Sequence, residues 1–432
     1  MSALADWARF PEDDLVRPIA RQPRTTFGQE PWLGGSAATL VYVLAGVLIV
    51  PRYGEMVDTV ARTANAFYVL FSRYPHLGAI GFVWTPLPSL LALPLVALKN
   101  VWPGLVRDAV ALNIVSALFG GLAVFFVLRM LRRLNLPGPV RWALAALLTL
   151  NPFVAFYATN GMTDMMMAAT LLGAVDGLWA YLEDGYAAHQ LAVSGIWMAI
   201  GFLMRYELLA WALVVAGALA VGLARLPRHA RPALGYWPWM AGLLLVWMTP
   251  LGYVVALWLF LNWSIMHDPF YFQHGAYGND AAVGTGAYLW APLEAARGHI
   301  MATLAVVGRQ TAIFPPVVVG LVGLLAYGLW GRHERHTRAL VVVAGTVGVP
   351  LLHVMLVYVG SGDPVWLRFF VTFIPFGVVS VAYTAHLAAT WTMPRVEARA
   401  LRGLIWMACI VGLAAGDGVS GYEFFVPSAA PT

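Results

Sequence analysis

Residues Met240–Leu261 read MAGLLLVWMTPLGYVVALWLFL, an apolar run without a charged side chain. A helix needs about 20 apolar residues to cross the hydrocarbon core of a bilayer, and this run has that length. Similar runs recur along the whole chain, which is 60% hydrophobic and only 11% charged. A typical soluble domain carries roughly 25% charged residues. The sequence therefore predicts a membrane domain throughout, with no room for a large soluble domain.

The pattern of apolar runs predicts an all-α, polytopic membrane protein with about eleven transmembrane helices. A cytoplasmic segment at residues 1–31 precedes a transmembrane domain at residues 32–416, and residues 417–432 form a short outer tail. The expected spans are Leu33–Val50, Ala109–Leu128, Trp142–Ala158, Met165–Tyr181, Leu191–Met204, Leu208–Ala224, Met240–Leu261, Ile313–Trp330, Ala339–Val359, Phe369–Ala388 and Leu404–Ala415.

The placement of basic residues predicts the orientation. With the N-terminus in the cytoplasm, the inside segments hold seventeen of the 26 Lys and Arg residues. This bias follows the positive-inside rule and predicts a multi-pass protein of the cytoplasmic (inner or plasma) membrane. The exception is the connection between the fourth and fifth spans, which carries Glu183 and Asp184 and no base. Because the basic residues are spread over short loops rather than gathered in one patch, we expect no nucleic-acid partner.

Two outer loops are long, at residues 51–108 and 262–312. The first contains Phe82–Val101, an apolar stretch interrupted by three prolines, which break helical hydrogen bonding. We expect a helix that lies along the outer interface or dips into it. The alternative is one more true span, which would reverse the sidedness of everything after it. The second loop contains Leu289–Gln310, for which we also expect an interfacial helix.

Two acidic residues at predicted outer helix ends are candidates for general-base chemistry. Asp58 follows the first span by a few residues, and Asp164 lies in the polar turn between the third and fourth spans. A carboxylate at the outer surface can accept a proton from a hydroxyl group. Alternatively, Asp58 solvates a helix end, and Asp164 interacts with the positive end of the fourth helix.

Two arginines occur where the positive-inside rule disfavours them. Arg205 lies with Glu207 in a tight hairpin between two spans, and Arg368 opens the tenth span from outside. A charge so near the hydrocarbon usually faces a cavity or a partner, and the planar guanidinium suits phosphate. For Arg205 the alternatives are a local pair with Glu207 or extension of the side chain to the interface.

Residues 73–88 combine basic and aromatic side chains. Arg73 and His76 can donate hydrogen bonds to a phosphate or a sugar hydroxyl, and Trp84 can stack on the apolar face of a sugar. The alternative is an ordinary aromatic and basic belt at the membrane surface.

The chain has no strong metal-binding motif and no nucleotide-binding glycine-rich loop. A divalent metal is compatible with the outer acids but is supported by no motif, so no cofactor is assigned. Since an enzyme working outside the membrane has no nucleotide-activated donor available, a lipid-linked donor fits better.

In their order and sidedness, these features resemble the C-type (GT-C) membrane glycosyltransferases, especially the branch of protein O-mannosyltransferases and aminoarabinose transferases. The likeness covers about residues 33–390, and each motif is weak alone. Two departures are clear: a single Asp58, with Glu55 three residues before it, replaces a pair of adjacent acids, and the outer tail is short where many relatives carry a soluble domain. The matching elements are Asp58, Tyr74–Pro88, Asn160–Asp164, Gly201–Glu207, His267–Phe270, and Arg368 with Pro375.

The resemblance implies transfer of a sugar from a polyprenyl-phosphate donor to an acceptor hydroxyl on the outer face, with inversion at the anomeric carbon. Asp58 would be the base, with Asp164 as the rival carboxylate. Arg205 and Arg368 would hold the lipid phosphate, assisted by Arg73 or His76. Residues expected on the sugar or acceptor side are Glu55, Tyr74, Trp84, Glu207, His267 and Asp268.

The sequence leaves the acceptor open, as a glycan, a lipid or a protein. It also leaves two other classes of protein open, a transporter or lipid flippase and a non-catalytic membrane scaffold. Long outer loops and the gathering of acids outside favour the enzyme.

Overall fold

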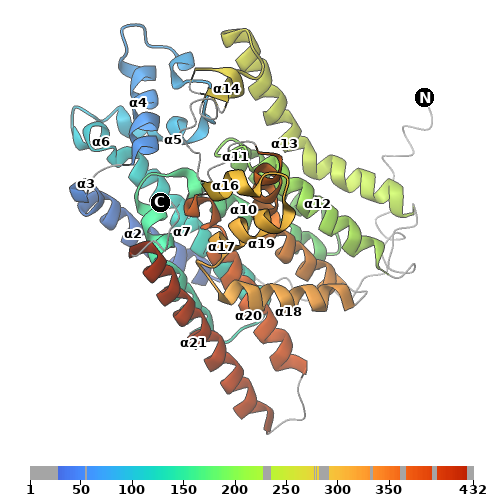
Figure 1. Cartoon of the computed structure of the whole chain (residues 1–432). Coiled ribbons are helices and arrows are strands. Elements are labelled where there is room, and N and C mark those ends of the chain that lie inside the picture. Colours follow the sequence, from blue (N-terminus) through green and yellow to red (C-terminus); the bar gives the residue numbers. More distant parts are fainter. Residues whose placement is uncertain are drawn as a thin grey trace.

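Every apolar run that the sequence predicts to cross the membrane is helical in the computed structural model (Figure 1). The structure describes residues 28–53, 56–226, 235–276, 278, 280–281, 291–330, 334–360, 366–391 and 397–425. Within these residues the elements are α2 (Glu30–Leu48), α3 (Val50–Tyr53), α4 (Val57–Phe71), η1 (Leu77–Ile80), α5 (Leu87–Val96), α6 (Gly104–Arg107), α7 (Val110–Arg133), α8 (Gly138–Leu150), α9 (Pro152–Thr159), α10 (Thr163–Glu183), α11 (Ala188–Phe202), α12 (Leu208–Ala224), α13 (Tyr236–Met266), α14 (Tyr271–His274), α16 (Ala291–Ala296), α17 (Ile300–Thr311), α18 (Pro316–Trp330), α19 (Glu334–Val359), η3 (Leu367–Phe370), α20 (Phe373–Trp391) and α21 (Glu397–Phe425).

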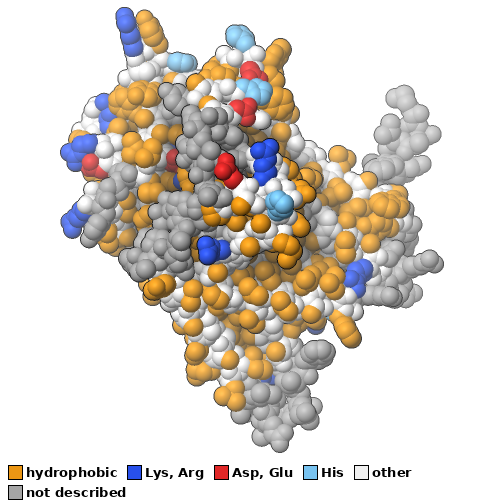
Figure 2. All heavy atoms as spheres, in the orientation of Figure 1, with side chains coloured by type: hydrophobic (Ala, Val, Ile, Leu, Met, Phe, Trp, Pro, Cys, Tyr) orange, Lys and Arg blue, Asp and Glu red, His pale blue; other side chains and the backbone are white. Residues whose placement is uncertain are grey.

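The all-helical, polytopic class is confirmed. Among the described residues, 7 helices are long and apolar enough to cross a membrane: α2, α7, α10, α13, α19, α20 with η3, and α21. Two bent pairs bring the number to 9 if each pair is one span. The predicted spans at α11 and α12 are helices of 15 and 17 residues. Apolar side chains cover much of the visible surface, as a lipid-facing protein requires (Figure 2).

The bend between α8 and α9 follows from two adjacent residues. Pro152 is the first residue of α9, where its missing N–H costs nothing. Asn151 caps the helix, its side chain accepting hydrogen bonds from the N–H groups of Phe153 and Val154 at 3.0 and 3.2 Å. The resulting 62° bend breaks the predicted third span in two.

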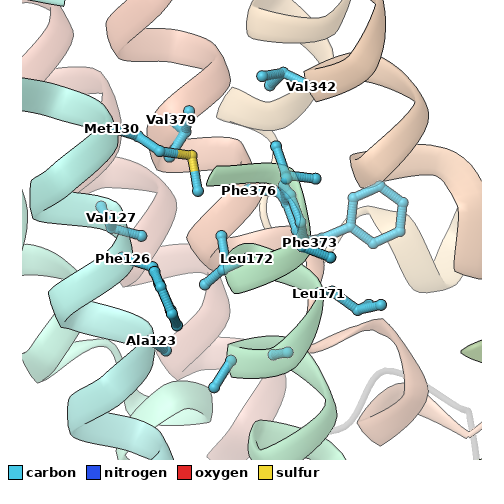
Figure 3. Close-up of a cluster of buried hydrophobic side chains, with 14 of the residues drawn as sticks. Ala123, Phe126, Val127, Met130, Leu171, Leu172, Val342, Phe373, Phe376 and Val379 are labelled. Carbon is cyan, nitrogen blue, oxygen red and sulfur yellow. The ribbon is translucent and has the colours of Figure 1, made fainter. Parts of the chain in front are cut away.

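The helices meet around α10, whose membrane-length window is wholly buried. Figure 3 shows the centre of this core, where Phe126 and Met130 of α7 face Leu172 of α10 and Phe376 of α20. All four side chains are at most 3% exposed. The predicted spans therefore pack around a central helix.

The outer loops contain helices as expected, but shorter ones. Within Phe82–Val101, α5 has 10 residues, which gives a length of about 15 Å. That is about half of the hydrocarbon thickness, so a full extra span is disfavoured. The prediction of one continuous helix over Leu289–Gln310 was wrong in the described part of this segment. The structure has two helices there, α16 and α17, and Gly298, with φ of +72°, lies between them.

A buried ion network explains the acidic exception on the predicted inside. Glu183, at the end of α10, accepts from Arg133 at 2.8 Å and pairs with Arg338 of α19. About two helical turns before Glu183 on the same helix, Asp176 pairs with Arg129 at 3.0 Å and with Arg133 at 3.2 Å. The bases that neutralise Glu183 thus come from other inside segments.

The interface between α2 and α7 depends on small residues that let the two backbones approach. A Cβ atom on Gly121 of α7 would overlap Thr39 Oγ1 and the carbonyl oxygen of Gly35 on α2. Such close packing is a usual way for membrane helices to associate.

We expect Gly121→Ala to destabilise the protein by about 1–3 kcal/mol, the usual cost of overpacking. The matched control is Gly242→Ala in α13, where a Cβ atom meets nothing within 4 Å. The measurement is the thermal midpoint of both variants in detergent. Equal thermal midpoints for the two variants would show that α2 and α7 can move apart at Gly121 without loss of stability.

We expect a membrane-impermeant maleimide to label Tyr74→Cys in intact cells and to label Asn135→Cys only after permeabilisation. Both positions are exposed, and the native Cys409 is buried, so background labelling is low. The opposite labelling pattern would reverse the predicted orientation.

Candidate functional site

The first ion pair of the site joins two segments that are 310 residues apart in the chain. Arg368 donates from Nη1 to Asp58 Oδ2 at 2.9 Å. Asp58 lies in the first turn of α4, and Arg368 lies in η3. The Asp58 side chain is 37% exposed and that of Arg368 is 16% exposed, so the carboxylate is within reach of a ligand.

The second ion-pair group surrounds Arg205, in the turn between α11 and α12. Arg205 donates from Nη1 to Asp164 Oδ1 at 2.8 Å and from Nε to Glu207 Oε1 at 2.9 Å. Asp164 lies in the first turn of α10 with a side chain that is 0% exposed. The predicted local pair of Arg205 with Glu207 therefore exists, and a second carboxylate joins it.

The electrostatics of this turn stabilise the charged forms. Burial alone lowers the pKa of Arg205, but the Glu207 and Asp164 carboxylates outweigh it and raise that pKa. Burial likewise raises the pKa of Glu207, and the Arg205 guanidinium outweighs it and lowers that pKa. The site therefore holds charged groups despite its removal from water.

One aromatic ring brings the two groups together. The guanidinium carbon of Arg205 lies 4.8 Å from the centroid of Phe369, and that of Arg368 lies 5.1 Å from the same centroid. Asp58, Asp164 and the two arginines, chosen from four separate motifs, thus form one cluster.

Arg62 belongs to this cluster, although the sequence did not indicate it as a functional residue. It lies one helical turn after Asp58 on α4 and is buried, with a pKa lowered to about 10 because burial disfavours the cation. Its Nη1 donates to the Thr85 carbonyl oxygen at 3.0 Å. The four-residue spacing from Asp58 was the available signal.

Trp84 is linked to the cluster because its ring contacts Arg62. The guanidinium carbon of Arg62 lies 5.2 Å from the Trp84 ring centroid. The backbone around Trp84 is bound to the Arg205 turn, since Thr85 Oγ1 donates to the Met204 carbonyl oxygen at 2.6 Å and Tyr206 Oη donates to that of Val83 at 3.2 Å. The first outer loop therefore positions the Arg205 turn.

The polar turn before Asp164 is fixed by α4. Thr59 Oγ1 donates to the Asn160 carbonyl oxygen at 2.7 Å. Gly161 has φ of +76°, and a Cβ atom there would overlap Thr59. Glycine is therefore required where α4 approaches this turn.

His353 is a second residue that the sequence did not indicate as functional. It lies in α19, is 2% exposed, and its ring stacks on Phe369 with centroids 5.1 Å apart and planes 4° apart. An ionisable residue within an apolar run was the signal that could have found it.

Several predicted site residues lie on the surface, and their described contacts are with one another rather than with this cluster. Arg73 lies over its neighbour Tyr74, with its guanidinium carbon 5.5 Å from the ring centroid, and His76 Nδ1 lies 2.6 Å from the Tyr74 carbonyl oxygen. All three side chains are exposed. Glu55 lies outside the described residues.

The segment from His267 to Phe272 flanks the site. His267 is exposed at the end of α13. Asp268 accepts from the Phe270 N–H at 2.8 Å and lies 2.9 Å from His274, and these two contacts lower its pKa. Phe272 stacks on Tyr206 at 4.8 Å between centroids. The segment thus packs on Tyr206, the residue before Glu207, and α14 lies at the same end of the bundle as α4 and α5 (Figure 1).

No group of three or more His, Cys, Asp or Glu residues in the described part of the chain is arranged to hold a metal ion.

No family model matches the chain, and no curated protein matches it. A similar solved structure is the archaeal oligosaccharyltransferase AglB from Archaeoglobus fulgidus in complex with an inhibitory peptide and a dolichol-phosphate, with 12% sequence identity and a TM-score of 0.49. The match covers 93% of this chain and 56% of that one, so this chain spans little more than half the length of that structure.

Proposed function

We propose that the protein is a membrane glycosyltransferase that moves a sugar from a polyprenyl-phosphate donor to an acceptor hydroxyl on the outer face of the cytoplasmic membrane. The observation that carries the proposal is the pair of Asp58 with Arg368, 2.9 Å apart and joined through Phe369 to Arg205. A reachable carboxylate beside convergent guanidinium groups supplies a base and an anion site together.

Burial distinguishes the two candidate bases. The Asp58 side chain is 37% exposed, whereas that of Asp164 is 0% exposed and is held by Arg205. A general base must come within hydrogen-bond reach of the proton that it takes. Asp58 therefore acts on the acceptor, and Asp164 holds Arg205 in place.

The arginines suit a lipid phosphate. A guanidinium group presents planar N–H donors that match phosphate oxygens. Arg368 is bound to Asp58 through Nη1, and its buried Nε has no hydrogen-bond partner among the described residues, so donors remain for a ligand. The apolar side chains of the surrounding helices offer a surface on which the polyprenyl chain can pack.

The reaction proceeds in one displacement. The acceptor oxygen forms a bond to the anomeric carbon, and the bond from that carbon to the phosphate oxygen breaks with its electron pair retained by the phosphate. Asp58 takes the acceptor proton, and Arg205 and Arg368 stabilise the charge that grows on the leaving phosphate. Attack opposite the leaving group inverts the configuration at the sugar.

A lipid flippase is the alternative, since it also needs a cationic site for a lipid phosphate. It does not need a base, so loss of the Asp58 carboxylate separates the two functions.

We expect Asp58→Asn to lower the rate of transfer by about 10²- to 10⁴-fold, the usual contribution of a general base. The change keeps the size of the side chain and removes its basicity. The measurement is release of polyprenyl phosphate from a panel of synthetic polyprenyl-phosphate sugars in nanodiscs, with membrane extract of the source cells as acceptor.

Asp164→Asn is the control for that experiment. It removes a buried partner of Arg205, so we expect lower stability with turnover partly retained. Full transfer by well-inserted Asp58→Asn, together with an inactive Asp164→Asn, would assign the base to Asp164. Lipid movement without sugar transfer in every variant would favour the flippase.

We expect Arg368→Ala to raise the Michaelis constant for the donor and to lower turnover. Loss of a charge-assisted hydrogen bond costs about 1.5–3 kcal/mol, which corresponds to about one to two decades in rate. Arg368→Lys should recover only part of the loss because it lacks the planar fork. Unchanged donor kinetics in folded Arg368→Ala would remove Arg368 from the phosphate site.

A further inference from the structure

We infer that Phe369 is a positioning residue that holds Arg205 and Arg368 together as one clamp for the donor phosphate. The inference rests on the proposed function. It concerns a side chain that carries no charge and does no chemistry of its own.

The first observation is that two cations share one ring. The guanidinium carbons lie 4.8 and 5.1 Å from the Phe369 centroid, within the range of a cation–π interaction. Like charges at such a site repel each other, and the negative face of the ring offsets part of that repulsion. The ring therefore favours an arrangement that two bare guanidinium groups would avoid.

The second observation is that the ring itself is fixed. Phe369 is 8% exposed, and the buried imidazole of His353 stacks parallel to it at 5.1 Å. Phe369 directly follows Arg368 in η3, so one short helix carries both the ring and that arginine. Trp366 adds a second ring to Arg368, 4.3 Å from its guanidinium carbon.

Stacking leaves the hydrogen-bonding edge of a guanidinium group available. An aromatic face interacts with the plane of the cation, whereas carboxylate and phosphate oxygens bind the N–H donors at its rim. Asp58, Asp164 and Glu207 bind those rims in the present structure. These bonds use only some of the five N–H donors of each guanidinium group, so a phosphate can bind the remaining donors while both arginines stay on the ring.

Binding of polyprenyl phosphate to the full-length protein in nanodiscs tests the inference. We expect Phe369→Leu to raise the Kd about tenfold, as loss of two cation–π contacts predicts. Phe369→Tyr keeps the aromatic face and should restore binding close to wild type. The matched control is Phe370→Leu, since Phe370 is 0% exposed and its ring lies against His353 and Phe373.

A double-mutant cycle separates positioning from general stability. If Phe369 acts through the arginines, the loss caused by Arg368→Ala should be at least about threefold smaller in the Phe369→Leu background, because residues in contact are not additive. Trp366→Leu gives a second measurement at a half-buried position that tolerates truncation better, and it should also weaken binding.

Equal Kd values for Phe369→Leu and Phe370→Leu, or independent effects of Phe369 and Arg368, would overturn the inference and leave the proposed function standing. Wild-type nanodiscs that bind no polyprenyl phosphate would overturn both.

Discussion

A carboxylate inside a membrane domain is stable only when a cation holds it, and α10 carries one at each end. Asp164 in its first turn is held by Arg205, and Glu183 at its last residue is held by Arg133 and Arg338. The whole of α10 has 21 residues and is about 30 Å long, which is the thickness of the hydrocarbon core. Between Asp164 and Asp176 the buried face of α10 carries no charge, and Asp176, about two turns before Glu183, is held in the same way by Arg129 and Arg133.

This constraint explains why distant segments meet at the end of α10 that carries Asp164. Burial of Asp164 requires Arg205, and the turn that carries Arg205 is in turn bound by the backbone around Trp84. Arg368 then joins from η3 through Asp58 and the shared Phe369 ring. Removing one partner of such a set leaves a buried charge uncompensated, which is costly. The cluster is thus a structural requirement as well as a candidate site.

The sequence predicted the helices because apolar length alone separates a membrane span from a loop. It could not predict the bend at Asn151 or the break at Gly298, which depend on local capping and on a positive φ. Asp58, Asp164, Arg205 and Arg368 were proposed from chain order, and only tertiary structure shows that they meet. His353 was missed because its contact with the Phe369 ring forms only in the tertiary structure, between residues on two different helices. For Arg73, Tyr74, His76, Glu55, His267 and Asp268, a role in binding stays a prediction.

The charge balance of the cluster bears on the proposed reaction. In the described part of the site, the cations of Arg62, Arg205 and Arg368 face the anions of Asp58, Asp164 and Glu207. A phosphodiester donor adds one negative charge. In the proposed reaction Asp58 would lose its charge on taking the acceptor proton and the departing phosphate would gain one, so the total charge of the site would stay constant. Arg368, which already lies beside Asp58, would then stabilise the more highly charged phosphate with the N–H donors that Asp58 does not use. A site whose dipoles and charges need little rearrangement during the reaction is the arrangement that electrostatic catalysis favours.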